Sequence, residues 1–351
     1  KTKEQDMSVK GHNPQKLNDP QAPHNLVIGS PYLQAFEWAI SQIFEKRAVM
    51  GVRGKINSLV LALQSIGVME GDEVIMPAFC APQNVIAVRR IGAIPVFVDI
   101  RLSDYAIDPG KIEESTTCRT KAILVPHMFG QPTTVMREIL AVSKARALPV
   151  IENISQAFLA KIRMDRKEKY AGTFGDIGCM GFLWGDDSDE GIGCLIFQDT
   201  SLIYQNALRK RSQKKGFVVS EKQLSYFFSK YKNFESQLQL RNNQAAYYRE
   251  RLSGVGDIVF PEVNEKVRSS WYRFVIRTGS GSDLRNFLRD RGTASDSLDK
   301  YLLVDSSKDD RSGDFPVSFK VASETVSLPI FRASDADIAS AVERVRCFFR
   351  H

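Results

Sequence analysis

The sequence predicts an α/β fold, in which a large domain with a mostly parallel, doubly wound sheet precedes a smaller C-terminal α/β domain. The first observation is a set of short, nearly uninterrupted apolar runs, which are typical of strands covered on both faces. These runs lie at 72–78, 94–100, 121–127 and 148–153. The second observation is that helix-length segments, such as 82–92 and 134–147, separate them. Strands that alternate with helices indicate parallel pairing.

The segment before the first of these strands is expected to hold two helices. Residues 30–46 carry apolar side chains at helical spacing behind a Ser-Pro start, and 55–68 is a second helix closed by Gly67. Residues 1–25 are polar and contain three prolines. We therefore expect a flexible arm there rather than a signal peptide.

The third observation is a change of pattern after residue 220. Residues 220–252 predict one long helical region. Beyond it, short strands are expected at 269–278 and 326–331, and helices at 283–292 and 335–350. We therefore divide the chain into an arm (1–25), a large domain (26–235) and a small C-terminal domain (236–351).

Composition favours a cytoplasmic globular protein. No apolar run approaches the roughly 18 residues that a transmembrane helix needs. The five cysteines lack CxxC spacing and the four histidines are scattered, so we expect free thiols and no metal site. The net charge is +7, and a basic run at 209–215 is either a solvated helix end or a patch for phosphate or an anionic membrane. No motif indicates nucleic-acid binding.

Several segments, taken in order, carry a resemblance to a known family. They are GDEVIMPAF (71–79), GAIPVFVDI (92–100), IDPGKIEESTTCRTKAILVPHMFGQP (107–132), LPVIENISQA (148–157), GTFGDIGCMGF (172–182) and VSLPIF (326–331). Together they resemble the DegT/DnrJ/StrS-type sugar aminotransferases, which are pyridoxal-phosphate (PLP) enzymes of the aspartate aminotransferase fold. The resemblance implies a nucleotide-linked sugar as ligand, a place in polysaccharide or nucleotide-sugar biosynthesis, and a homodimer whose sites are built from both subunits.

Within this resemblance, the residues that would carry the cofactor chemistry differ. The position of the family's Schiff-base lysine is Asp186, and no lysine occurs between Lys169 and Lys210. The lysine holds PLP as an imine and moves a proton, and an aspartate cannot form that imine. The family's aspartate at the pyridine nitrogen is Asn153, which cannot compensate the charge of a protonated ring.

Other positions that touch PLP in the family also differ. The stacking aromatic is Ala81, the phosphate-binding Ser-Gly-Thr has become RGKI at 53–56, and a strand serine is Gly181. We therefore expect a degenerate member that lacks the Schiff-base lysine and binds no cofactor in the family's way. Its vestigial cofactor positions are Arg53, Lys55, Ala81, Asn153, Gln156 and Gly181.

An acidic loop stands where the imine would be, between two apolar strands at 179–184 and 193–197. Three interpretations are open. Asp186 or Asp187 acts as a catalytic acid or base on a bound sugar, because crowded carboxylates raise one another's pKa. The acidic residues gather a hard cation, although the spacing of a calcium loop is absent. The loop is a solvated turn that lost its constraint.

Further residues are expected near this loop, at the ligand site that such folds form beyond the carboxyl ends of the strands. His127, Trp184 and Phe79 are candidates for a substrate pocket, where the two aromatic rings could stack on a base or sugar. A histidine in this place is more often a structural hydrogen-bonding residue than a catalytic one, and aromatic residues on strands are more often core. Arg53 and Lys55 either grip a nucleotide diphosphate or begin a solvated helix.

These observations support three hypotheses for function. The first is a PLP-free homologue, unable to transaminate, that binds a nucleotide sugar or pairs with an active aminotransferase paralogue. The second is an enzyme that acts on a nucleotide sugar by acid–base chemistry without PLP. The third is an atypical aminotransferase or dehydratase that holds PLP non-covalently.

Overall fold

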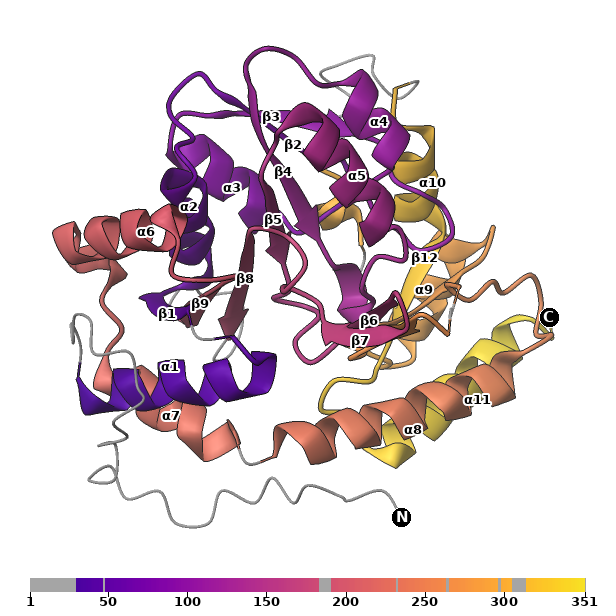
Figure 1. The fold of residues 1–351 in the computed structure, drawn as a ribbon. Coiled ribbons are helices and arrows are strands. Elements are labelled where there is room, and N and C mark those ends of the chain that lie inside the picture. Colours follow the sequence, from indigo (N-terminus) through magenta and orange to yellow (C-terminus); the bar gives the residue numbers. More distant parts are fainter. Residues whose placement is uncertain are drawn as a thin grey trace.

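The large part of the molecule is built on a seven-stranded sheet (Figure 1). The computed structural model describes residues 30–46, 48–182, 191–231, 233–262, 265–295, 298–304 and 314–350. The expected arm at 1–25 lies outside them. The strands run in the order β1-β9-β8-β5-β4-β2-β3, and only β9 is antiparallel to its neighbours. Their bounds are β1 Ala48–Arg53, β2 Glu73–Pro77, β3 Ile94–Val98, β4 Thr120–Pro126, β5 Val150–Asn153, β8 Ile177–Phe182 and β9 Ile192–Phe197.

Helices cover both faces of this sheet, as the apolar runs predict. Along β4, Ala122 and Leu124 join one core, while Ile123 and Val125 join the other. The first core includes residues of α2 (Lys55–Ser65), α3 (Gln83–Arg90) and α6 (Leu202–Gln213). The second includes residues of α1 (Pro31–Phe44), α4 (Pro109–Glu114), α5 (Met136–Arg146) and α7 (Glu221–Tyr231). The prediction of a doubly covered, mostly parallel sheet is confirmed.

The strands on either side of the acidic loop form an antiparallel hairpin. Their pairing runs from Ile177 opposite Phe197 to Phe182 opposite Ile192. The described pairing of these two strands ends at Phe182 and Ile192. The loop itself, at 183–190, lies outside the described residues.

The C-terminal part has a core of its own. It packs α8 (Phe234–Leu252), α9 (Gly281–Asp290) and α11 (Asp335–Phe348) against a strand pair, β11 (Phe274–Arg277) with β12 (Thr325–Leu328). The rings of Tyr248 and Phe274 stack there at 4.6 Å between centroids. Helix α10 (Pro316–Glu324) instead gives Val321 to the first core of the large sheet. The division near residue 235 stays a prediction.

One predicted element is wrong: residues 220–252 are two helices, α7 and α8, rather than one. The reason is packing. Leu224 and Phe227 of α7 belong to the core beneath α1, whereas Tyr248 and Leu252 of α8 belong to the C-terminal core. Figure 1 shows α7 beside α1 and α8 beside α11. A single straight helix could not bury both apolar faces.

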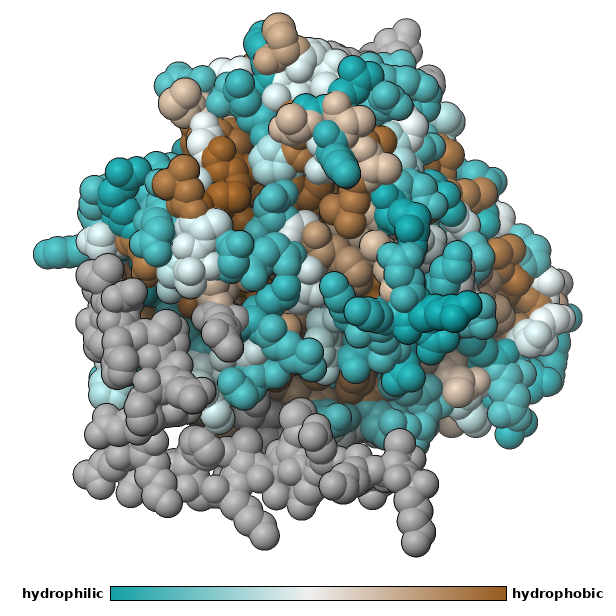
Figure 2. All heavy atoms as spheres, viewed as in Figure 1, coloured by the Kyte–Doolittle hydropathy of each residue, from teal (hydrophilic) through white to brown (hydrophobic). Residues whose placement is uncertain are grey.

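The remaining elements are short. A second sheet has three strands in the order β10-β6-β7, and 3₁₀ turns occupy Met128–Gly130, Lys215–Phe217 and Asp299–Tyr301. The bounds of the strands are β6 Lys161–Met164, β7 Lys167–Tyr170 and β10 Val267–Arg268. On the face drawn in Figure 2, hydrophilic side chains are interrupted by apolar patches. None of the helices in the described residues is long and apolar enough to cross a membrane.

Candidate active site

A cavity of about 980 Å³ opens at the carboxyl ends of the parallel strands. Pro126 at the end of β4, Asn153 at the end of β5 and Phe182 at the end of β8 all line it. The start of α2 contributes Lys55, and the C-terminal part closes the other side with residues such as Arg273. The mouth of the site therefore lies where the topology of an open parallel sheet places ligands.

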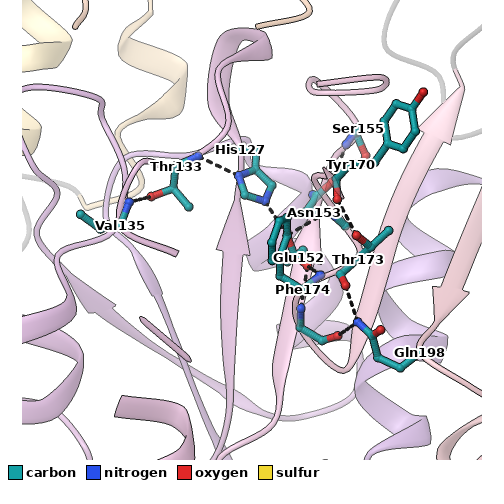
Figure 3. Close-up of polar contacts among 12 residues, drawn as sticks. His127, Thr133, Val135, Glu152, Asn153, Ser155, Tyr170, Thr173, Phe174 and Gln198 are labelled. Carbon is teal, nitrogen blue, oxygen red and sulfur yellow. Dashed lines mark hydrogen bonds and ion pairs between the residues drawn. The ribbon is translucent and has the colours of Figure 1, made fainter. Parts of the chain in front are cut away.

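His127 follows β4 and is held from both ring nitrogens (Figure 3). The backbone N–H of Thr133 donates to Nδ1 at 3.0 Å, and Nε2 lies 3.0 Å from a carboxylate oxygen of Glu152. Because Nδ1 accepts a hydrogen bond, the ring proton is on Nε2 and is donated to Glu152. Neither nitrogen is left for a ligand. The structural interpretation of His127 is therefore favoured over catalysis by this geometry.

Glu152 is the centre of this cluster, and its side chain is fully buried. Besides His127, its carboxylate accepts the backbone N–H groups of Gly172, Phe174 and Gly175 at 2.7–2.9 Å. Burial alone would raise the pKa of Glu152, but the hydrogen bond from His127 and these backbone groups outweigh it and hold the pKa below the ordinary value. The cluster fixes the segment at 172–175 beside β5.

Asn153 is held just as firmly. Its Nδ2 donates to Oδ1 of Asn84 at 2.7 Å, while its Oδ1 accepts from the backbone N–H and the hydroxyl of Ser155. The amide oxygen is thus used twice, and one Nδ2 hydrogen remains. Asn153 can therefore offer a donor to a ligand in the cavity. Gln156 also lines the cavity, and its Oε1 accepts from the backbone N–H of Phe129 at 2.8 Å.

Lys55 and Gly181 are in direct contact across the cavity wall. Lys55 is the first residue of α2 and is only 8% exposed. A Cβ placed on Gly181 would overlap the Cβ of Lys55 and lie 3.1 Å from its Cα. The glycine in β8 therefore provides the room that the Lys55 stem occupies. Ala81 lines the same cavity, but Arg53, at the end of β1, is exposed and does not line it.

The prediction that Phe79 faces the pocket is wrong. Phe79 is fully buried and does not line the cavity. Its ring lies about 6 Å from those of Phe129 and Tyr301, so it joins the core that supports the cavity floor. Trp184, Asp186 and Asp187 lie outside the described residues, so their roles stay predictions.

Arginine and lysine side chains from the C-terminal part line the cavity, and the sequence analysis did not find them. They are Arg241, Arg273, Lys300 and Arg332. Arg241 is one of several described residues with a buried side-chain polar atom that has no hydrogen-bond partner among the described residues, in its case Nε. Its guanidinium faces the ring of Phe331 at 5.6 Å, and burial lowers the pKa of Arg241 to about 10. No local signal marks these residues, because they reach the strand ends only through the fold.

The basic run at 209–215 is neither wholly solvated nor a simple surface patch. Arg211 is buried, and its guanidinium contacts Oε1 of Glu37 at 2.6 Å and the backbone oxygen of Gly51 at 3.0 Å. It therefore anchors α6 to α1 and β1. Lys214 and Lys215 are exposed, as the solvated interpretation expects.

Among the described residues, no three histidine, cysteine or acidic side chains gather as metal ligands. The acidic loop is outside that part of the chain. Whether it holds a cation therefore stays an open interpretation.

Comparison with known proteins identifies relatives of the whole chain. A model of the DegT/DnrJ/EryC1/StrS aminotransferase family matches residues 15–213 and 217–346. A dTDP-3-amino-3,6-dideoxy-alpha-D-galactopyranose transaminase of Aneurinibacillus thermoaerophilus is 29% identical over 311 residues, which cover 84% of each protein. S. venezuelae DesV, solved in complex with a ketimine intermediate, has a TM-score of 0.80 at 24% identity and covers 92% of this chain and 90% of its own. Spr1654 from Streptococcus pneumoniae, solved in a PLP-form, has a TM-score of 0.80 at 17% identity and covers 93% of both chains.

These findings confirm the predicted fold and correct the cofactor expectation. We expected no cofactor because residues that touch PLP in the resembled family differ here. The matching family is one of aminotransferases, and a structure of the same fold carries PLP. A cavity is present at these substituted positions, and Lys55 and Asn153 line it. PLP is therefore the cofactor to consider in it.

Proposed function

Because the chain belongs to the DegT/DnrJ/EryC1/StrS aminotransferase family, we propose that it binds a nucleotide-linked sugar together with PLP in the cavity at the ends of β4, β5 and β8. Its role would then lie in nucleotide-sugar biosynthesis, where the Aneurinibacillus relative is a transaminase. The proposal covers the ligand class and the cofactor, which the sequence resemblance and the cavity support together.

The charge of the cavity wall is the observation that carries this proposal. Among the described residues that line it, five are lysine or arginine and none is aspartate or glutamate: Lys55, Arg241, Arg273, Lys300 and Arg332. A wall of one sign concentrates ligands of the opposite sign. A nucleotide diphosphate and the phosphate of PLP are such ligands, and arginine is well suited to grip them.

Aromatic side chains supply the other half of the recognition. Phe158, Phe182, Phe234, Tyr272 and Phe331 line the cavity beside the cations. Rings of this kind stack on bases and on the apolar faces of sugars. A polyanion that carries a base and a sugar therefore matches both kinds of lining.

The residues present also fit PLP. The N-terminus of α2, whose first residue Lys55 lines the cavity, is a helix end of the kind that favours phosphate. The remaining Nδ2 hydrogen of Asn153 can be donated to an unprotonated pyridine nitrogen. When bound, PLP supplies an aldehyde that takes up an amine and a ring that accepts electrons. Glu152 and His127 hold the strand ends that carry Asn153, so its donor is fixed in place.

The test is a pair of titrations on the full chain. We expect PLP and dTDP-glucose each to raise the melting temperature in a saturable way, and the effect of dTDP-glucose to weaken with salt. Arg241→Met should weaken dTDP-glucose binding by about tenfold or more, as expected for loss of a buried charged contact. Arg209→Met, at an exposed arginine of α6, is the matched control and should bind as the unmodified protein does. Failure of both ligands to bind would contradict the proposal.

A second candidate is a protein that binds the nucleotide sugar without transferring an amino group, alone or beside an active paralogue. The observation that favours it is the absence of lysine between Lys169 and Lys210, which covers β8 and the loop after it. An amino-transfer assay with glutamate and a dTDP-linked keto-sugar separates the two candidates. Transfer by the purified chain would reject the second, whereas binding without transfer would favour it.

We also propose that the chain forms a homodimer and that it is cytoplasmic. Tyr32 and Trp38 of α1 are partly exposed and offer apolar area for a subunit contact. Light scattering on the purified chain measures the mass directly. A monomer at working concentration would contradict the dimer.

A further inference from the structure

We propose that Lys55, from the N-terminus of α2, is the lysine that bonds to the aldehyde of PLP in this protein. The inference rests on the proposed function, because it requires PLP in the cavity. In the resembled family this lysine comes from the loop after β8. In this protein the lysine would come from α2 and reach the same cavity.

The first support is placement. Lys55 lines the cavity in the company of Ala81, Asn84 and Asn153, and it is 8% exposed. Lys300 is the other lysine among the described lining residues, and it is exposed beside the ring of Tyr301. Lysines that form bonds to carbonyl ligands are typically desolvated, because burial disfavours the charged ammonium and so favours the neutral amine, which is the nucleophile. Lys55 alone of the two meets that condition.

The second support is the fit between Lys55 and Gly181. Any side chain on Gly181 would overlap the Cβ of Lys55, so the close approach of α2 to β8 at this point requires a glycine at 181. Gly181 has no positive φ and lies inside strand β8, where glycine is disfavoured unless another group approaches closely. The close approach here is the Lys55 stem. The glycine therefore allows the first residue of α2, Lys55, to lie directly against β8 in the cavity wall.

The third support is that no alternative comes from β8 or the loop that follows it. The sequence has no lysine between Lys169 and Lys210, whatever conformation the loop at 183–190 adopts. Lys169 lies in β7, in a separate sheet, and does not line the cavity. A bond to PLP through the family's own position is thus excluded by composition, and Lys55 is the buried amine that the fold supplies in its place.

The chemical step is a condensation. The lone pair of Lys55 Nζ attacks the aldehyde carbon, a carbon–nitrogen double bond forms, and the aldehyde oxygen leaves as water with the two protons of the amine. No oxidant or reductant is consumed. Borohydride then adds hydride to the double bond and leaves a stable secondary amine, which marks the lysine permanently.

The experiment identifies which lysine carries the reduced pyridoxyl group. The full chain is incubated with an equimolar amount of PLP, freed of unbound cofactor, reduced with borohydride, digested and analysed by mass spectrometry. We expect the pyridoxyl group on the peptide that contains Lys55. Lys210→Arg, on α6, is the matched control and should be labelled like the unmodified chain.

Two variants separate a bond from a charge contact. Lys55→Arg keeps a positive charge but cannot form the bond, so it should lose the label and still show thermal stabilisation by PLP. Lys55→Met removes both and should lose the label and most of the stabilisation, and it serves if the larger arginine disturbs folding. Circular dichroism checks that each variant is folded.

The outcomes are distinct. Labelling of Lys300 or of another lysine overturns the inference. Saturable binding of PLP without a label on Lys55 also overturns it, but leaves the proposed function standing. Absence of binding by both PLP and dTDP-glucose overturns the inference and the proposed function together.

Discussion

Two polar regions meet the same cavity, one through His127 and the other through Arg241, and they differ in how their hydrogen bonds are used. At the ends of β4 and β5, the carboxylate of Glu152 and both ring nitrogens of His127 have partners inside the protein. On the opposite wall, Nε of Arg241 is buried with no hydrogen-bond partner among the described residues. Buried polar groups are normally satisfied, so each such atom needs a reason, and for Arg241 the cavity that it lines supplies one.

This difference indicates that the two regions have different roles. A buried charge that is fully hydrogen-bonded fixes one conformation of the backbone around it. A buried charge that is left unsatisfied weakens the folded state unless a ligand completes it. We therefore interpret the Glu152 cluster as part of the fold and Arg241 as part of the binding surface. The predictions below test that contrast.

Glu152→Ala should have the largest effect. It removes the acceptor of the His127 proton and of the backbone N–H groups at 172–175, and leaves those donors buried without partners. Each buried donor left without its partner costs about 1–3 kcal/mol, so the loss of an acceptor shared by several donors should cost about 3 kcal/mol or more. Urea unfolding measures the free-energy change. A cost below about 1 kcal/mol would mean that the cluster does not hold the fold.

Gly181→Ser should have the next largest effect. Its new Cβ would overlap Lys55, and overpacking of this kind costs about 1–3 kcal/mol. Lys55→Gly in the same chain should recover part of that stability, because it removes the Cβ of residue 55 that the new side chain overlaps, whereas Lys55→Ala keeps that Cβ and should recover little. Gly216→Ser is the control, since nothing lies within 4 Å of a Cβ there. Equal costs at 181 and 216 would refute the contact between strand and lysine.

Arg241→Met should have a smaller effect of the opposite sign. Methionine keeps an apolar stem and removes a partly buried charge whose Nε lacks a hydrogen-bond partner among the described residues, so the ligand-free protein should gain on the order of 1 kcal/mol or less. The same variant is the one expected to lose affinity for dTDP-glucose. Thermal unfolding without ligand, compared with Arg209→Met, measures the gain. A loss of stability in Arg241→Met would place Arg241 with the fold.

The smallest expected effect is a contrast in pH dependence between two buried carboxyl groups. The pKa of Glu152 is lowered, so its contribution to stability is present above the ordinary value of 4.5 and is lost as the pH falls through the folded value. Burial raises the pKa of Glu37, against the opposing charge of Arg211, so its contribution weakens as the pH rises above 4.5.

Urea midpoints measured between about pH 3 and pH 8 test this contrast. Stability of the unmodified chain should fall at the acidic end because of Glu152. Glu37→Gln should flatten the curve above pH 4.5, where the ordinary glutamate value lies. Identical curves above that pH for the variant and the unmodified chain would contradict the assignment to Glu37.

Local patterns predicted the elements of the large sheet but not all of its pairings. The apolar runs at 72–78 and 121–127 became β2 and β4 because each is covered on both faces, and such coverage leaves a mark in every residue of the run. The strand β1 escaped notice, and its antiparallel pairing with β9 joins residues far apart in the chain. The break between α7 and α8 also depends on which core each helix meets.

The candidate site was predicted in part for the same reason. Asn153, Gln156 and His127 follow strand ends, so the sequence places them at the mouth of the sheet, and they line the cavity. Phe79 also stands near a strand end, yet its side chain packs into the core. The direction of a side chain at a strand end depends on its neighbours in space, which a local pattern does not contain.

By itself, the sequence determined the α/β class, the positions of the parallel strands and the absence of a lysine between 169 and 210. These follow from residue identity and from periodicities that act over a few residues. Only the tertiary structure decided that Lys55 lies against Gly181 and that Arg241 faces the strand ends. Those contacts join segments far apart in the chain, and their geometry is set by how two cores pack rather than by any local preference.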